Sequence, residues 1–116
     1  MSPGGDVPAG NRALQGPARV FAALGDESRL RLVARLCAGG PTSIAQLTAG
    51  SGVTRQAITK HLHVLADAGL VRGLHQGREC LWNVKRQKLE ATRRYLDVIS
   101  RQWDEALGRL KVFVER

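Results

Sequence analysis

The sequence is poor in the residues and segments that define several classes of protein. It holds only two cysteines, Cys37 and Cys80, which are too few for a disulfide scaffold or a four-cysteine zinc site. No run of apolar residues approaches the roughly 20 that a membrane-spanning helix needs, and residues 1–11 lack the apolar segment of a signal peptide. We therefore expect a reduced cytoplasmic protein without a membrane-spanning segment.

Aromatic and acidic residues are also scarce. Aromatics make up 4% of the chain against 43% for all hydrophobic residues, so the core must be built from aliphatic side chains. Lysine and arginine number 18 against 10 aspartates and glutamates, which gives the 116 residues a formal charge of +8. A chain of this length forms one domain, and its positive charge indicates a polyanionic partner, either nucleic acid or an anionic membrane surface.

Motifs typical of enzymes and metal proteins are absent too. The chain has no glycine-rich phosphate loop, no serine nucleophile elbow and no acid pair placed for catalysis. Its three histidines, His61, His63 and His75, show no zinc-ligand spacing with each other or with the cysteines. We therefore predict a protein that is not an enzyme and that binds no metal and no cofactor.

Glycine and proline divide the first part of the chain into short segments. Residues 1–16 are rich in both, so we predict a disordered N-terminal tail, with order beginning at Pro17. The helix that follows ends at Gly25, and Asp26 is the expected N-cap of a second helix that ends at residues 39–41. The spacing i, i+3, i+4, i+7 predicts a buried stripe in this second helix, and a second apolar side lies beside it. The stripe is Leu30, Val33, Ala34 and Cys37, and the second side is Leu32 and Leu36.

The rest of the chain has the outline of a helix-turn-helix followed by a hairpin. A short third helix with a cap at Thr42 or Ser43 is separated by a glycine-containing turn from a fourth helix, which Thr54 caps and Gly69 ends. The fold class is therefore mainly α with a small antiparallel β-hairpin, a winged helix-turn-helix. The later elements are expected at residues 55–68 for the fourth helix, 70–75 and 80–84 for the strands, and 86–116 for one long final helix.

The fourth helix has two different sides. At about 100° per residue, Ile58, Leu62 and Leu65 fall within one narrow arc and face the core. The opposite side carries hydrogen-bond donors and positive charge, with no carboxylate before Asp67, which suits the acceptor-rich major groove of DNA. A merely solvated surface is the alternative, but the helix N-terminus and the basic hairpin favour double-stranded DNA. The predicted DNA-binding residues are Thr54, Arg55, Gln56, Thr59, Lys60 and His63 of the helix and Arg72, His75, Gln76 and Arg78 of the hairpin.

These segments resemble the ArsR-type family of winged-helix repressors. The resemblance runs from Phe21 to about Glu115 and rests on FAALGDESRLRLVARL, IAQLTAGSGVTRQAITKHLHVLADAGLV and GLHQGRECLWNV, with ITKHLHVLADAGLV as the most specific piece. It implies a homodimer that binds a palindromic operator and represses transcription, often including that of its own gene. The WDEAL segment from Trp103 to Leu107 is similar to a branch that generally lacks metal-sensing motifs.

The sequence departs from the metal-sensing branches of that family. One such branch carries a cysteine motif where this chain has residues 43–47, which contain no thiol, and others place histidines on the last helix, where residues 86–116 have none. His63 stands where many relatives have arginine, which leaves the base preference open. We therefore predict a regulator without a metal-sensing site, whose small-molecule inducer is unknown.

The final helix carries two apolar series that repeat every seven residues, three positions apart, with Thr92 as the one polar member. Such a seam can pack on its own domain, but a seam this narrow and this long favours a partner helix. We therefore predict a homodimer that forms through the terminal helices. The expected interface is Val20, Phe21 and Leu24 of the first helix with Leu89, Leu96, Ile99, Trp103, Ala106, Leu110 and Phe113 of the last.

These residues allow three functions. The first is a homodimeric, sequence-specific repressor without a metal site, and it agrees best with the donor-rich helix. The second is a repressor of the same fold that responds to thiol chemistry at Cys37 or Cys80, or to a small molecule near Trp103. The third is a winged-helix module that binds protein or RNA. The predicted organisation is a tail at 1–16, a DNA-binding unit at 17–85 and a dimerisation helix at 86–116 of the same domain.

Overall fold

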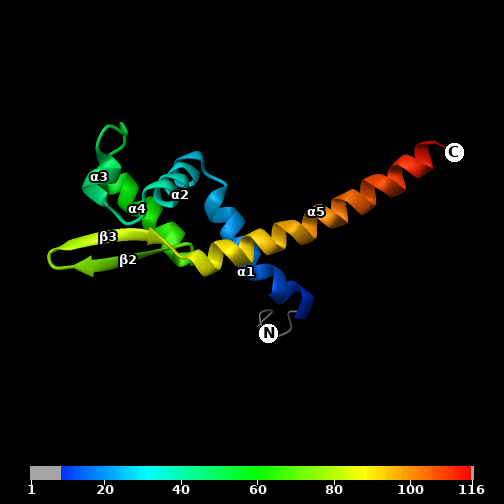
Figure 1. The fold of residues 1–116 in the computed structure, drawn as a ribbon, viewed down its shortest axis with the longest axis horizontal. Helices are drawn as coiled ribbons and strands as arrows, with labels where there is room; N and C mark the ends of the chain where they lie inside the picture. The colour runs from blue at the N-terminus through cyan, green and yellow to red at the C-terminus, as the bar shows by residue number, and fades with distance from the viewer. Residues whose placement is uncertain (1–8, 116) are drawn as a thin grey trace, which may run out of the picture.

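The structure is a computed structural model that describes residues 9–115, with side chains from residue 15 onward (Figure 1). Its described part is mainly helical and contains one small antiparallel sheet, as predicted. The elements in chain order are α1 (Ala9–Leu24), α2 (Glu27–Gly39), β1 (Thr42–Ser43), α3 (Ile44–Thr48), α4 (Arg55–Asp67), β2 (Val71–Gln76), β3 (Glu79–Val84) and α5 (Arg86–Val114).

The winged helix-turn-helix is formed by α3, α4 and the β2–β3 hairpin. The sheet has the order β1-β3-β2, so the hairpin gains a third strand on its β3 edge. In the central strand, Trp82 lies between Thr42 of β1 and Gly73 of β2. The sequence did not indicate β1, because a strand of two residues has no periodicity to detect.

Polar side chains cap three of the helices at the predicted residues. The side chains of Asp26, Ser43 and Thr54 accept hydrogen bonds from backbone N–H groups three positions along the chain. At α3 the bond is reciprocal, since the Gln46 side chain accepts from the Ser43 backbone N–H at 3.0 Å. Gly69 follows α4 with φ = 81°, as expected for the residue that ends a helix in the left-handed region.

Helix α1 begins earlier than predicted. It starts at Ala9, so residues 9–16, which the sequence assigned to a disordered tail, are helical, and residues 1–8 lie outside the described residues. Pro17 lies inside the helix and not in its first turn. Proline favours the first turn because its missing N–H costs nothing there, whereas inside a helix it removes one hydrogen bond and its ring crowds the carbonyl four residues earlier.

The burial pattern of α2 contradicts part of the prediction. Leu32 and Leu36 of the second apolar side are buried, and so is Val33 of the predicted stripe. The rest of the predicted stripe is exposed: Leu30 is 52% exposed, and Ala34 and Cys37 are also at the surface. The predicted burial of Cys37 is therefore wrong, because the neighbouring elements cover the side of α2 that carries Leu32, Val33 and Leu36 and leave Cys37 at the surface.

The core is aliphatic except for Trp82, which is 9% exposed. Its centre is formed by Leu62 and Leu65 of α4, which are completely buried, together with Leu36 of α2 and Leu47 of α3. These side chains hold α4 against both preceding helices, and Leu70 and Val71 extend the core to the start of the wing. The remaining buried members are Val20, Ala23, Leu32, Val33 and Ile58.

Helix α5 projects away from this core (Figure 1). The radius of gyration is 18.6 Å, whereas a compact chain of this length has a value of about 13 Å. The helix packs on α1, where the rings of Phe21 and Tyr95 lie 5.9 Å apart, and every residue from Ser100 to Glu115 is exposed. The second half of α5 therefore has no support from its own protomer among residues 9–115.

Replacing Leu62 by alanine should strongly destabilise the protein. The side chain is completely buried at the centre of the core, so Leu62→Ala should lower the free energy of unfolding by about 2–5 kcal/mol. Val64→Ala, on the same helix but 40% exposed, should change it by less than about 1 kcal/mol. Urea unfolding followed by circular dichroism measures both, and equal losses would mean that α4 is not oriented as described.

Candidate nucleic-acid interface

The outward side of α4 is separated from the core by the geometry of the helix. Ile58, Leu62 and Leu65 have exposed fractions of 2% or less, whereas Gln56 and Lys60 are exposed on the opposite side. Thr59 is half-buried, and its hydroxyl donates to the Arg55 carbonyl oxygen at 2.8 Å. Because the core residues fix the rotation of the helix, they also fix which polar side chains point outward.

The N-terminus of α4 is exposed and is capped by Thr54. The Thr54 hydroxyl accepts from the Ala57 N–H at 3.1 Å, and Arg55 and Gln56 follow at the surface. The first N–H groups of a helix have no acceptor within it, and together with the helix dipole they attract an anion such as a phosphate. The turn before it is held by Ser51, whose side-chain oxygen accepts from the Val53 N–H at 3.1 Å.

The wing presents its predicted residues on two different faces. Arg72, His75, Gln76 and Arg78 are all exposed. Since side chains alternate along a strand, Arg72 and Gln76 share one face of β2, and His75 lies on the other, across from Cys80. The turn contains Gly77 with φ = 62° and open space around it, which lets another molecule come close to the backbone.

Two further cations, which no motif in the sequence had marked, lie near Arg72. Lys85 and Arg86, at the start of α5, line the same shallow hollow of about 310 Å³ as Arg72. Lys85 and Arg86 come close to Arg72 because the β2–β3 hairpin returns the chain to the root of the wing. In the sequence, their positive charge was the one sign that they could contact DNA. Arg72 therefore belongs to a basic cluster at the root of the wing and not to its tip.

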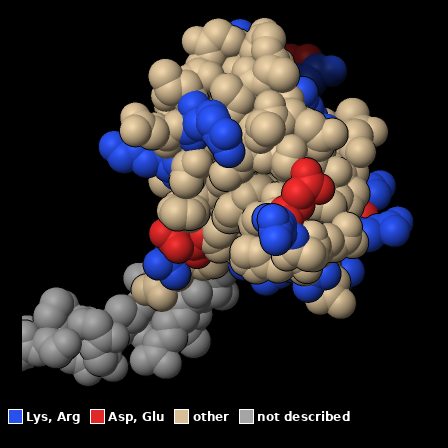
Figure 2. All heavy atoms as spheres, turned by 90° about the vertical axis from the view of Figure 1, so that its left-hand side faces the viewer, with Lys and Arg blue, Asp and Glu red and all other residues tan. Residues whose placement is uncertain are grey.

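Positive charge is spread over the end of the molecule that carries α3 and the wing tip. Figure 2 views this end, where Lys and Arg side chains are more widely distributed than Asp and Glu side chains. One carboxylate belongs to the wing itself, because Glu79 pairs with Gln76 beside the turn. The surface is thus a set of separate cations that surrounds an uncharged area and not one continuous basic patch.

His63 links α4 to the wing. It is exposed, as predicted, but its ring also lies against Trp82, with 6.1 Å between ring centroids and a tilt of 48°. Trp82 is buried in the central strand, and its Nε1 has no hydrogen-bond partner among the described residues. A Cβ at Gly73, opposite Trp82, would lie 3.0 Å from the Cys80 sulfur, which is a tight contact, and 3.5 Å from the indole, which is an ordinary van der Waals distance.

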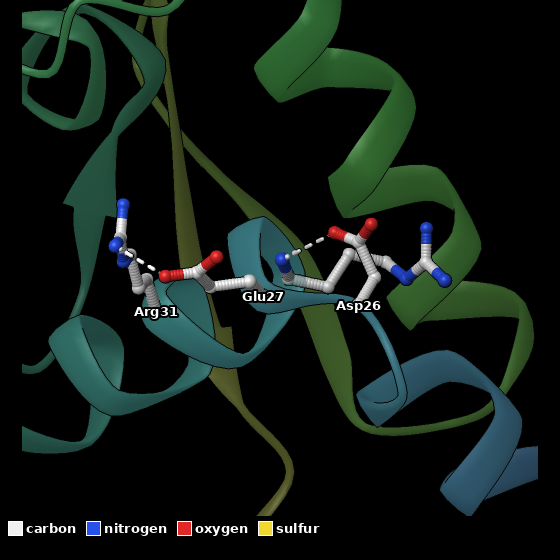
Figure 3. Close-up of polar contacts among 4 residues, drawn as sticks. Asp26, Glu27 and Arg31 are labelled. Carbon is white, nitrogen blue, oxygen red and sulfur yellow. Dashed lines mark hydrogen bonds and ion pairs between the residues drawn. The ribbon is translucent and has the colours of Figure 1, made fainter.

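Polar contacts stabilise the corner between α1 and α2, which lies beside α4 (Figure 3). Asp26 accepts from the Arg29 backbone N–H at 3.0 Å, and this hydrogen bond is the main cause that lowers the pKa of the Asp26 carboxyl below its usual value. The Arg29 side chain donates to the Ala23 carbonyl oxygen at 2.6 Å, at the end of α1. Glu27 and Arg31 form an exposed ion pair one turn apart on α2.

The predicted interface residues fall into two groups. Leu96, Trp103, Leu110 and Phe113 are 49–70% exposed along α5, and Ala106 is exposed with them. Phe21, Leu24, Leu89 and Ile99 are half-buried, and Leu24 and Leu89 pack against the core. Val20 is completely buried in its own protomer, so its assignment to an intermolecular interface is wrong. Four further apolar residues of α5 are exposed but lie outside the seven-residue repeat, namely Val98, Leu107, Val112 and Val114.

The two thiols lie on separate elements. Cys37 is exposed on α2, and Cys80 is half-buried on β3, and neither forms a disulfide. Across the described residues, no group of three or more His, Cys, Asp or Glu side chains is placed to hold a metal ion. None of the helices between Ala9 and Val114 is both long enough and apolar enough to cross a membrane.

Comparison with known proteins places this geometry among transcriptional regulators. Residues 24–73 match the family model described as a helix-turn-helix domain. The chain is 36% identical over 91 residues to the HTH-type transcriptional regulator Rv2034 of Mycobacterium tuberculosis, a match that covers 78% of this chain and 81% of that protein. It also superposes on the structure of an ArsR-like transcriptional regulator from Rhodococcus sp. RHA1 with a TM-score of 0.73 and 37% identity, covering 89% and 94% of the two chains.

A more distant structure shares the fold. It is the homodimeric winged helix-turn-helix DNA-binding domain of Mb0332 from Mycobacterium bovis, described as a possible ArsR-family transcriptional regulator. The TM-score is 0.66 at 21% identity, and the match covers 86% of this chain and 91% of that one. At this identity the likeness concerns the fold, and the homodimer is a property of the Mycobacterium protein.

The contact between His63 and Trp82 predicts a difference between two variants. If His63 mainly positions the wing, His63→Phe should keep the ring contact and bind DNA within about twofold of the parent chain, whereas His63→Ala should bind about fivefold more weakly. Fluorescence anisotropy with a duplex from the region upstream of the gene measures both affinities. Equal weakening in the two variants would instead mean that the imidazole itself contacts the DNA.

Proposed function

Because this chain belongs to the ArsR family of winged helix-turn-helix, DNA-binding transcriptional regulators, we propose that it is a homodimeric repressor of a palindromic operator and has no metal-sensing site. The observation that carries this proposal is the outward side of α4, which is exposed, rich in donors and without a carboxylate before Asp67. An α-helix with such a side fits the major groove, where base edges and phosphates offer acceptors.

The predicted DNA-binding residues divide by chemistry into two roles. Gln56 and Thr59 read base edges, because an amide can pair with adenine and a threonine methyl can contact thymine. Lys60 and Arg78 attract the phosphate backbone and add affinity without sequence preference. The N-terminus of α4 at Thr54 and Arg55 supports a further phosphate contact, and Arg72 extends the basic surface to the root of the wing.

The dimer is supported by the exposed apolar residues of α5. A helix whose second half is wholly exposed, with Trp103 at 65% and Phe113 at 70%, is stabilised when a second copy covers it. A two-fold dimer presents the same surface twice and places two α4 helices about one DNA turn apart, roughly 34 Å. The operator must then have the same two-fold symmetry, which is why we propose a palindrome.

Regulation without a metal is supported by the α3 region. Residues 43–47 contain no thiol, and Ser43 and Gln46 are engaged in the reciprocal cap of α3. The alternative of a thiol-responsive repressor remains a prediction; in the protomer Cys37 is exposed and Cys80 is half-buried. A module that binds RNA or protein instead of an operator is the other alternative, and a comparison of two duplexes distinguishes it.

The proposal is tested by comparing specific and non-specific binding. The parent chain should prefer the duplex from upstream of its own gene over a scrambled duplex, and its affinity should fall steeply with salt because each chain carries +8. Lys60→Ala and Arg78→Ala should weaken binding to both duplexes and flatten the salt slope. Gln56→Ala and Thr59→Ala should instead reduce the preference between duplexes by about 1–3 kcal/mol for each base pair that is no longer read.

Gel-shift titrations at two salt concentrations measure these affinities for the parent and the four variants. Equal affinity for the upstream and the scrambled duplex would end the proposal of a specific repressor and favour a module for RNA or protein. Identical behaviour of the four variants would show that the division into base-reading and phosphate-binding residues is wrong.

Replacing Trp103 by aspartate should disrupt the dimer. The indole lies in the middle of the exposed seam, and burying a carboxylate there against an apolar partner is strongly unfavourable. Analytical ultracentrifugation should find Trp103→Asp as a monomer, and its operator affinity should fall. The matched control is Val98→Asp, an exposed apolar position of the same helix outside the heptad seam. A dimeric Trp103→Asp protein would contradict the assignment of the interface.

A further inference from the structure

A cavity of about 230 Å³ lies inside the helix-turn-helix, between α2, α3, the turn after α3, and α4. It is separate from the outward side of α4, because the α4 residues that line it are Ile58 and His61. It is also separate from the exposed seam of α5, which contributes no residue to its lining. Neither the DNA-binding surface nor the proposed dimer uses it.

The floor of the cavity is apolar. It is formed by Leu32 of α2, Leu47 of α3 and Ile58 of α4, which all belong to the buried core, and by the half-buried Val53 of the turn. An apolar cavity of about 150 Å³ is large enough to hold a benzene ring. A cavity of 230 Å³ therefore has room for one ring or a branched chain with a small polar group attached.

The rim of the cavity is cationic. Its positive charges are Arg31 and Arg35; His61 and two serine hydroxyls add hydrogen-bonding groups, and no Asp or Glu side chain is among the described residues that line it. Arg35 is held in place because its guanidinium donates to the carbonyl oxygens of Leu47 at 2.9 Å and Gln46 at 2.6 Å. Arg31 pairs with Glu27 in a contact that leaves both side chains more than three-quarters exposed, so a ligand anion can compete for it.

We propose that this cavity binds a small monocarboxylic acid with an aromatic or branched apolar body, and that the bound acid weakens operator binding. The apolar body fits the floor, and the carboxylate fits Arg31 and His61 at the rim. The regulatory part rests on the proposed function. Its physical basis is that Val53, which lines the cavity, directly precedes Thr54, the cap of the helix end proposed to receive a phosphate.

The sign and size of the effect follow from charge. A carboxylate at the rim adds a negative charge near the expected phosphate contact, so it lowers the affinity for DNA. For charges about 10 Å apart in water, the Coulomb interaction changes the affinity by about twofold. Two occupied cavities in a dimer should therefore weaken operator binding by about fourfold, and less at high salt.

Binding to the cavity is tested on the full chain without DNA. Isothermal titration calorimetry with sodium benzoate should show one saturable site per chain, and benzamide and sodium acetate should each bind about tenfold more weakly because one lacks the charge and the other the ring. Val53→Phe, which fills the cavity, should abolish the site, and Val98→Phe on α5 should not. Arg31→Gln should weaken binding about tenfold, whereas Arg101→Gln, an exposed arginine outside the cavity, should leave it unchanged.

Absence of saturable benzoate binding to the parent chain overturns the proposal, and so does equal binding by Val53→Phe or Arg31→Gln. The two variants change different parts of the cavity. If Val53→Phe does not fold, the benzoate affinity of Arg31→Gln still tests whether the acid binds there. The second measurement is operator affinity at saturating benzoate against the same concentration of acetate, and an unchanged affinity overturns the regulatory part. A parent chain that binds no operator at all refutes the proposed function, while the calorimetry still decides whether the cavity is a binding site.

Discussion

The burial of one side of α4 is the interaction on which the rest of this structure depends. Ile58, Leu62 and Leu65 are held by the aliphatic core of α2 and α3, and their burial fixes the rotation of the helix about its axis. A rotation by one residue would move each side chain by about 100° and bring polar groups into the core. The same contacts therefore stabilise the protein and determine that Gln56 and Lys60 face outward.

The two ends of the molecule are supported in different ways. At the wing end, the three-stranded sheet, Trp82 and His63 connect β1, the wing and α4 through side chains that touch. At the other end, α5 leaves the core with exposed apolar residues and no contacts of its own beyond the region of Phe21 and Tyr95 among the described residues. The residues proposed to contact DNA thus lie within one protomer, whereas the apolar side chains in the second half of the last helix are left exposed by that protomer.

Most elements could be predicted because local rules specify them. The caps at Asp26, Ser43 and Thr54 and the left-handed Gly69 mark helix ends through hydrogen bonds between neighbours in the chain. Burial was harder to predict where a helix is apolar on two sides. Cys37 and Val20 were both misplaced, because tertiary packing alone decides which apolar side of α2 and α1 is covered. The contact of His63 with Trp82 and the cavity beneath His61 join distant segments, which no local pattern reveals.

The exposed second half of α5 has a consequence for how such a regulator responds to its own abundance. If pairing of α5 is the step that creates two linked α4 helices, the concentration of the active form rises with the square of the concentration of free chains while these remain mostly monomeric. Occupancy of a symmetric site then increases more steeply than in a one-to-one binding curve. Small changes in synthesis or degradation of the chain would produce a sharper change in transcription than a monomeric regulator could achieve.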